Sequence, residues 1–371
     1  MKTTDRRKWL KTVGLTGGFA LMGGLDALAL SNTHTNFHLE DETAKLNSNE
    51  NPYGPSKMVR QTLIDSFDKA CRYPSIVLRE LVLQLAEKEG VTKDHIVITG
   101  GSTEGLKAAG LTYGLDGGEL IAADPTFQSM LRYAENYGGF VHRVPVNDKK
   151  GHDLEAMAKR VTGRTSLIFI CNPNNPTGTL IEKGKLRDFC TSMDRKAMIF
   201  SDEAYYDYIT EPDYPSMIEL VKEGRNVIVS KTFSKVYGLA GLRIGYLVAR
   251  PDISNRLKAS VMAMTNTLAV EAAKTALKDD TFYKYSVAKN MEAKQMIYET
   301  LNDLNLEYIP SHTNFVFFKS GRHIDALSAA MEQEHVLIGR PFPPFYDWAR
   351  ISTGTLAQVE QFGKALKKVM G

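Results

Sequence analysis

The sequence has little cysteine: only three stand in 371 residues, Cys71, Cys171 and Cys190, and no C-x-x-C pair occurs. This wide spacing argues against a disulfide scaffold and against a zinc site built from thiolates. The eight histidines are equally scattered and form no H-E-x-x-H pattern, so a metal enzyme has little support. The chain also lacks a run of about 18 apolar residues, which argues against a polytopic membrane protein.

What the chain does contain is an ordinary globular composition, with 43% hydrophobic and 24% charged residues. These values exclude disorder, collagen and coiled coil as overall descriptions. The length predicts one large domain or two modest ones, with ample chain for a buried core.

The first 29 residues predict an export signal. Arg6 and Arg7 precede a mildly apolar, glycine-rich run at 12–25, and the A-L-A of 27–29 follows as a cleavage site. The paired arginines resemble the twin-arginine type, whereas the alternative is a cytoplasmic protein with a basic arm. The chain has 46 basic and 43 acidic side chains, and residues 1–29 hold five of the former and two of the latter. The remainder is neutral, so its charge favours neither nucleic acid nor an anionic membrane surface as a partner.

Beyond this segment, strands and helices alternate. Apolar runs bounded by turn residues predict buried parallel strands at Ile96–Thr99, Glu119–Ala123, Ser166–Cys171, Ala197–Ser201, Val227–Ser230 and Ile244–Val248. Amphipathic segments between them, such as Leu78–Glu89 and Leu186–Asp194, predict helices, so the expected fold class is α/β with a mostly parallel sheet between helices. After residue 265 a smaller α+β unit is expected, with helices at Phe282–Leu304 and Leu356–Met370 and strands at Asn314–Phe318 and Ala349–Ser352.

A glycine-rich turn follows the first predicted strand. Residues 100–105 (G-G-S-T-E-G) lead into a helix, whose N-terminal N–H groups offer an anion site. The turn is not a P-loop, because Leu106 stands where the lysine is needed, and the G-x-G-x-x-G spacing is absent. An ordinary capped helix start is the alternative for this segment.

Polar residues end three further predicted strands. The strand 166–171 runs into residues 172–178 (N-P-N-N-P-T-G), whose asparagines can direct amide groups into the crevice at the sheet's carboxyl edge. Asp202 begins D-E-A-Y after the next strand, with a helix cap as its alternative role. Lys235 and Arg243 follow the strand 227–230, and both stand among hydroxyl, apolar and glycine residues. They suggest an amine nucleophile beside an anion clamp, against the alternative of a solvated surface.

Together these residue types match the needs of one cofactor. Pyridoxal phosphate (PLP) requires a lysine amine for its aldehyde, an acid for its ring nitrogen, donors for its phenolate oxygen and an anion site for its phosphate. With these motifs in this order, residues 44–371 resemble a fold type I, class I/II aminotransferase of the histidinol-phosphate aminotransferase branch. The resemblance begins in the segment 46–55 (L-N-S-N-E-N-P-Y-G-P) and ends in 350–355 (R-I-S-T-G-T).

The resemblance implies roles for individual residues. Lys235 would form the Schiff base and move the substrate proton, Asp202 would pair with the ring nitrogen, and Tyr205 would share the phenolate oxygen with Asn175. These make Lys235, Asp202 and Tyr205 the implied catalytic residues. The implied phosphate-binding residues are Ser102, Thr103, Thr232, Ser234 and Arg243, with Phe127 stacked on the ring and Tyr73 reaching the phosphate of a neighbouring subunit. The implied substrate-binding residues are Arg350 for the α-carboxylate, Arg340 for a distal anion, and Asn51.

The resemblance also implies an activity and an assembly. A homodimer with shared active sites would move an amino group between a small amino acid and a 2-oxo acid. The predicted signal peptide, which departs from the family pattern, would place this enzyme away from a cytoplasmic biosynthetic pathway. Histidinol phosphate and an aromatic amino acid are candidate donors, although Met262–Thr267 lacks the proline and aromatic residues usual in that branch. A PLP-dependent decarboxylase or lyase on the same scaffold is the enzyme alternative, and a non-catalytic exported binding protein is the alternative from another class.

The expected domain limits follow the same pattern. Residues 1–29 are the signal peptide, 30–65 join the small domain, 66–265 form the large PLP-binding domain, and 266–371 form the small C-terminal domain. Neither a metal, nor nucleic acid, nor stable membrane insertion of the mature chain is expected.

Overall fold

The structure is a computed structural model that describes residues 43–371. The predicted export signal at 1–29 lies outside the described residues, as does the part of the predicted 30–65 segment before residue 43. No helix in the described range is both long enough and apolar enough to cross a bilayer.

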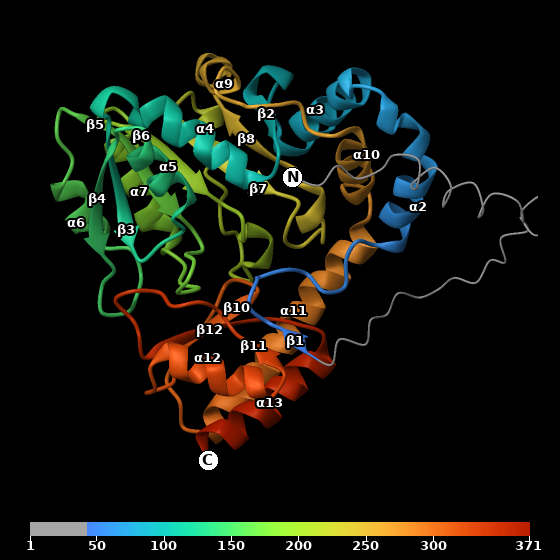
Figure 1. The fold of residues 1–371 in the computed structure, drawn as a ribbon. Coiled ribbons are helices and arrows are strands. Elements are labelled where there is room, and N and C mark those ends of the chain that lie inside the picture. Colours follow the sequence, from blue (N-terminus) through green and yellow to red (C-terminus); the bar gives the residue numbers. More distant parts are fainter. Residues whose placement is uncertain (1–42) are drawn as a thin grey trace, which may run out of the picture. The chain divides into compact units, whose positions relative to one another are not determined.

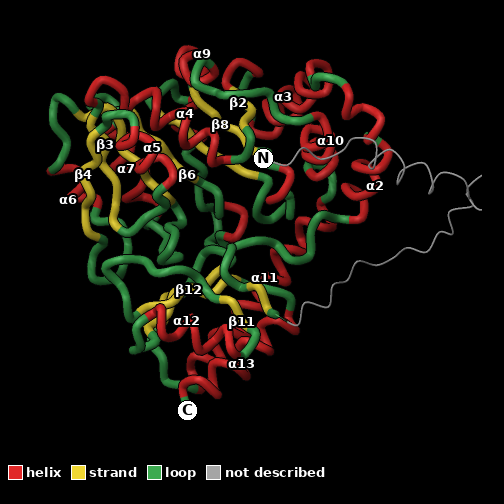
Figure 2. Tube along the Cα trace, in the orientation of Figure 1, coloured by secondary structure: helices red, strands yellow, loops and turns green. Residues whose placement is uncertain are grey.

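A seven-stranded sheet forms the centre of the larger part of residues 43–371 (Figure 1, Figure 2). Its strands are β2 (Ile96–Thr99), β3 (Glu119–Asp124), β4 (Phe140–Pro145), β5 (Thr165–Cys171), β6 (Met198–Asp202), β7 (Val227–Thr232) and β8 (Gly245–Ala249). Their spatial order is β2-β8-β7-β6-β5-β3-β4. The predicted mostly parallel α/β sheet is confirmed.

Strand β8 differs from the prediction, because it runs antiparallel to both of its neighbours, β2 and β7. Its five residues are all buried, which is the pattern that suggested a parallel strand. Burial on both faces produces that pattern in either direction, so apolarity alone does not tell strand direction. The antiparallel return means that the loop 233–244 between β7 and β8 begins and ends at one edge of the sheet.

Helices cover both faces of this sheet. In β5, Ile168 and Ile170 enter one hydrophobic core while Leu167 and Phe169 enter the other, as the alternation of a strand requires. The first core is closed by α3 (Ser75–Glu89), α6 (Leu154–Lys159), α7 (Lys183–Met193), α8 (Ile218–Lys222) and α10 (Thr267–Ala276). The second is closed by α4 (Ser102–Gly114), α5 (Ser129–Asn136) and α9 (Pro251–Lys258).

A smaller part surrounds a second sheet, drawn in orange and red in the lower half of Figure 1. The antiparallel strands β9 (Tyr308–Ile309), β10 (Phe315–Lys319) and β12 (Trp348–Ser352) form it, in the order β12-β10-β9. The surrounding helices are α11 (Asp280–Asp303), α12 (Ile324–Gln333) and α13 (Leu356–Met370). A short parallel pair, β1 (Ala44–Lys45) with β11 (Val336–Leu337), completes it. The late change to an α+β pattern is therefore present in the fold.

The segment 46–55 connects β1 of the smaller part with α2 (Lys57–Asp65), and is called here the connecting segment. Helix α2 contributes Val59, and α10 contributes Val270, to the first core of the large sheet. The predicted limits 30–65 and 266–371 for the small domain therefore include two helices that pack with the other core. Helix α10 is the more informative case, because its alanine-rich face gave no sign of which sheet it would cover.

Candidate active site

A cavity of about 710 Å³ opens at the edge of the large sheet where the parallel strands end. Its walls combine the turns after these strands with the connecting segment and with residues of β12 and the loop before it. Ligands of α/β proteins bind at this edge, because the loops there can vary without disturbing the sheet. The cavity is the candidate site.

Lys235 reaches this cavity from the loop 233–244, whose return also brings Arg243 to it. The Nζ atom of Lys235 donates to the backbone carbonyl of Asn49 at 2.7 Å. Burial, reinforced by the nearby Arg350 guanidinium, lowers the pKa of Lys235 to about 8. A lysine with such a pKa has a substantial neutral fraction near neutral pH, so it can act as nucleophile or base.

Asp202 ends β6 and is only 2% exposed. One carboxylate oxygen accepts a hydrogen bond from the backbone N–H of Ala204 at 3.3 Å. Burial raises the pKa of Asp202 to about 7. A buried acid of this kind is suited to bind a protonated nitrogen of a ligand, which would restore its charge.

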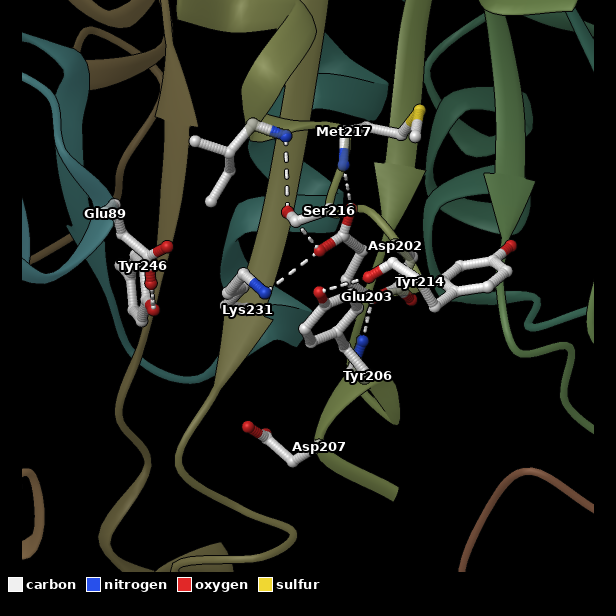
Figure 3. Close-up of polar contacts among 12 residues, drawn as sticks. Glu89, Asp202, Glu203, Tyr206, Asp207, Tyr214, Ser216, Met217, Lys231 and Tyr246 are labelled. Carbon is white, nitrogen blue, oxygen red and sulfur yellow. Dashed lines mark hydrogen bonds and ion pairs between the residues drawn. The ribbon is translucent and has the colours of Figure 1, made fainter. Parts of the chain in front are cut away.

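The neighbouring Glu203 makes a separate set of contacts (Figure 3). Its carboxylate pairs with Lys231 Nζ at 2.9 Å and accepts from the Ser216 hydroxyl and from the Met217 N–H, both at 2.7 Å. Burial alone would lower the pKa of Lys231, but the carboxylates around it, led by Glu203, outweigh burial and raise that pKa. Lys231 therefore stays charged and paired, and it does not line the cavity.

Tyr205 presents its hydroxyl to the cavity between two amide groups. Asn49 Nδ2 donates to the hydroxyl oxygen at 3.0 Å and Asn175 Nδ2 donates to it at 3.3 Å. Burial raises the pKa of Tyr205, so the phenol keeps its proton at any physiological pH. The same Asn175 accepts from the Arg350 guanidinium at 2.7 Å, which links the two sheets across the cavity.

The N-terminus of α4 forms an anion cradle at the other end of the cavity. Gly101 is its N-cap residue at φ 82°, and no side chain caps the first turn. A side chain at Gly101 would be strained at this positive φ, and its Cβ atom would also crowd the Arg243 guanidinium. Ser102 and Thr103 in the first turn, together with Ser234, supply hydroxyl groups around it. These donors fit a phosphate group.

Two arginines approach the cavity from the smaller part. Arg350 of β12 is 8% exposed, its Nε atom has no partner, and no Asp or Glu of residues 43–371 forms an ion pair with it. Arg340 lies over the ring of Phe342 at 4.4 Å, and Arg350 lies over the same ring at 4.8 Å. Burial lowers the pKa of Arg350 to about 10. A buried cation with free N–H groups is suited to bind a carboxylate.

Most residues singled out in the sequence meet at this cavity. Those that line it are Ser102, Thr103, Phe127, Asn175, Asp202, Tyr205, Ser234, Lys235, Arg243, Arg340 and Arg350. Thr232 stands behind them, with its hydroxyl bonded to the Ser234 hydroxyl at 3.0 Å. Tyr73 is 88% exposed and lies outside the cavity of its own chain.

Asn51 does not line this cavity. The sequence placed it among the substrate-binding residues, but its side-chain amide donates to the carbonyl of Val236 and to the Ser286 hydroxyl, and accepts from the Tyr53 N–H. These bonds engage the amide away from the cavity, and the substrate-binding role of Asn51 stays a prediction. Asn49, two residues earlier, lines the cavity instead and was missed, as was Cys171 at the end of β5.

A cavity of this make-up, over the carboxyl edge of a sheet in this strand order, defines a PLP-dependent enzyme of fold type I. The groups present fit the cofactor: the glycine-lined cradle suits its phosphate, the buried acid its ring nitrogen, and the lysine its aldehyde.

The chain belongs to the family of class I and II aminotransferases, whose pattern matches residues 41–366. It is 39% identical over 332 residues to the histidinol-phosphate aminotransferase of Moorella thermoacetica, covering 89% of this chain and 86% of that protein. The histidinol-phosphate aminotransferase of Sinorhizobium meliloti, solved with pyridoxal-5'-phosphate, superposes with a TM-score of 0.82 at 26% identity, covering 88% and 90% of the two chains. The protein is therefore a PLP-dependent aminotransferase.

A more distant structure shows why the fold alone does not decide the reaction. The L-threonine-O-3-phosphate decarboxylase of Porphyromonas gingivalis superposes with a TM-score of 0.75 at 24% identity, covering 87% of this chain and 98% of that one. The same scaffold thus serves a different chemistry there, and the assignment to transamination rests on the family and not on the fold.

Proposed function

We propose that Lys235 carries the cofactor and moves the substrate proton, while Asp202, Tyr205 and Asn175 hold the cofactor ring. The burial of Asp202 and the lowered pKa of Lys235 support these roles. The phosphate would be bound by Ser102, Thr103, Ser234 and Arg243, with Thr232 orienting Ser234 and Phe127 stacked on the ring.

PLP, when bound, supplies an aldehyde for the substrate amine and a ring that withdraws electrons from the substrate Cα. The chain's own groups do the rest. Asp202 regains a full negative charge beside a protonated ring nitrogen and keeps it protonated. Lys235 can accept the Cα proton and deliver it again, since its pKa lies close to neutral. Arg350 retains the substrate carboxylate, which favours breaking the Cα–H bond over decarboxylation.

The observation that carries this function is the presence of a buried cation and a buried amine in one cavity. Arg350 is a buried cation without an acid partner in the described residues, and Lys235 is a buried amine of lowered pKa. An α-amino acid provides the carboxylate for the first and the amine chemistry for the second. Incubating the purified holoenzyme with single amino donors tests the proposal. Formation of the matching 2-oxo acid supports it, and release of CO₂ instead would favour the decarboxylase alternative.

We further propose that the preferred donor bears a distal anion, with histidinol phosphate as one candidate. Arg340 lines the cavity, and its guanidinium and that of Arg350 both lie over the Phe342 ring. Arg340 has no acid partner in the described part of the chain. Burial and the nearby charge of Arg132 lower the pKa of Arg340, and the charge of Arg340 in turn contributes to the lowered pKa of Arg350. The names of the relatives support the same donor class.

Arg340→Ala is expected to lower kcat/KM for anionic donors such as histidinol phosphate by roughly 10- to 100-fold, the value of a charge-assisted hydrogen bond. Aromatic donors should be little affected, because they do not need the charge. The measurement compares kcat/KM for phosphorylated, acidic and aromatic donors in both proteins. Arg322→Ala, an exposed arginine bonded to Val369 near the C-terminus, is the matched control. Equal losses for all donors, or none, would reject the contact.

We propose a homodimer in which Tyr73 binds the cofactor phosphate of the partner subunit. Tyr73 is strongly exposed, and three apolar side chains close to it in the sequence are exposed as well: Ile64, Phe67 and Ile76. Such clustered apolar exposure is typical of a surface that another protein covers. A second copy of this chain is the occupant proposed.

We also propose that the protein is exported by the twin-arginine route as a folded holoenzyme. The support is in the sequence: Arg6 and Arg7, the mild apolar run and the A-L-A site stand in the order that such signals have. Replacing both arginines by lysine is expected to leave active enzyme in the cytoplasm, measured by fractionation and activity. Normal export of that variant, or intact residues 1–29 on all of the wild-type protein, would contradict the proposal.

A further inference from the structure

Asn49 lies in the connecting segment and contacts two of the proposed catalytic residues, Lys235 and Tyr205. It is 3% exposed and adopts φ 40°, a conformation that few residues other than glycine and asparagine adopt readily. Its backbone carbonyl accepts from Lys235 Nζ at 2.7 Å, and its side-chain amide donates to the Tyr205 hydroxyl at 3.0 Å.

The orientation of the Asn49 amide is fixed by Ser352. The Ser352 hydroxyl donates to Asn49 Oδ1 at 2.6 Å, and its oxygen accepts from the Asn49 backbone N–H at 2.8 Å. The amide oxygen is thereby turned toward the serine and the NH₂ group toward Tyr205. Ser352 stands two residues after Arg350 on β12, so both side chains rise from the same face of that strand.

This arrangement constrains the Tyr205 hydroxyl. A phenol oxygen has two acceptor positions and one hydrogen. Asn49 and Asn175 both donate to it, which occupies the acceptor positions and leaves the hydrogen as the only group free to turn elsewhere. Each donated bond also polarises the O–H bond and strengthens it as a donor.

We propose that Asn49 is a positioning residue that makes the Tyr205 hydroxyl an obligate hydrogen-bond donor toward the cofactor, with Ser352 holding Asn49 in place. This inference rests on the role proposed above for Tyr205. A donor at the phenolate oxygen stabilises negative charge there and so lowers the pKa of the nitrogen that joins Lys235 to the cofactor. Asn49 would thereby set the pH at which that nitrogen loses its proton.

Asn49→Gly is the sharpest test, since glycine accepts φ 40° and removes only the amide. The pH midpoint of the visible absorption band of the holoenzyme should rise by roughly half to one pH unit, the size of one lost hydrogen bond. Ser352→Ala should shift it in the same direction by less. Asn305→Gly, a matched change at an exposed residue with φ 53°, should leave the midpoint unchanged.

A double-mutant comparison separates Asn49 from Tyr205. In a Tyr205→Phe background, Asn49→Gly should add no further shift, because its action passes through the missing hydroxyl. A full additional shift in that background would overturn the inference, as would an unchanged midpoint in both Asn49→Gly and Ser352→Ala. If Tyr205→Phe itself leaves the midpoint unchanged, the proposed role of Tyr205 fails and the inference fails with it. If Asn49→Gly does not retain cofactor, the shift in Ser352→Ala decides.

Discussion

Lys235→Ala is expected to lower the transamination rate by on the order of 10⁴-fold or more, because it removes both the amine that carries the cofactor and the base that moves the substrate proton. Among residues 43–371, no other lysine lines the cavity. Lys231, four residues earlier, is held by the Glu203 carboxylate at 2.9 Å and does not line the cavity. Single-turnover kinetics and loss of the visible band of bound cofactor measure the effect. Lys364→Ala, on the exposed face of α13, is the control. Wild-type turnover in Lys235→Ala would refute the assignment.

The same variant tests the shared site of the proposed homodimer. Chains carrying Lys235→Ala, coexpressed with chains carrying Tyr73→Ala, form hybrid dimers in which one site receives both intact residues. Random pairing makes half of the dimers hybrid, so about a quarter of the wild-type activity should return. No recovery in purified hybrids would show that Tyr73 does not act across an interface.

Asp202→Asn is expected to lower kcat by about 10²- to 10³-fold, since a neutral amide cannot keep the ring nitrogen protonated and the loss resembles that of one buried electrostatic contact. Cofactor binding should persist, because the phosphate cradle at α4 is untouched. An Asp202→Asn enzyme with unimpaired kcat would remove Asp202 from the mechanism.

In the cofactor-free protein, Asp202→Asn is expected to increase stability at neutral and higher pH. Burial raises the pKa of Asp202 to about 7 from roughly 3.9 in an unfolded chain, so the folded state binds the proton more tightly. The free energy of unfolding therefore falls as pH rises from about 4 to 7 and levels off above, by up to about 4 kcal/mol. The Asp202→Asn protein has no carboxyl at this position, so its free energy of unfolding should not show this fall with pH. Its apo form should melt at a higher temperature than apo wild type at pH 8, with little difference near pH 4.

The part of the site that could be predicted from the sequence consists of polar and glycine-rich motifs that follow predicted strands. The turns 100–105 and 172–178 and Asp202 stand directly after apolar runs, Lys235 follows the run 227–230, and parallel strands place all of their ends at one edge. The convergence of these residues at the cavity could be predicted from their order, whereas their chemical roles stay predictions. Arg243 precedes β8 and reaches the same edge only because β8 runs antiparallel to β7.

The sequence did not predict strand β4, the position of Asn49 at the cavity or the direction of β8, because each depends on contacts between distant parts of the chain. Strand β4 lies at the sheet edge and exposes alternate residues, so it lacks the continuous apolar run of its neighbours. Asn49 and Asn51 are equivalent in the sequence, and only the positions of Ser352 and Ser286 decide which amide faces the cavity. The direction of β8 likewise depends on its partners β2 and β7.

The buried Glu203–Lys231 pair has a consequence for how this site can change over generations. Glu203 directly follows Asp202 at the end of β6, and Lys231 lies in β7 four residues before Lys235. Removing one of the two charges leaves the other buried without a partner, which lowers the free energy of unfolding by about 3–5 kcal/mol. Replacing both residues with apolar ones is often neutral for stability. A single substitution at either position is therefore destabilising, and we expect the two positions to change together during evolution. We expect directed evolution of new donor preferences to advance faster through Arg340, which forms no ion pair with a described acid.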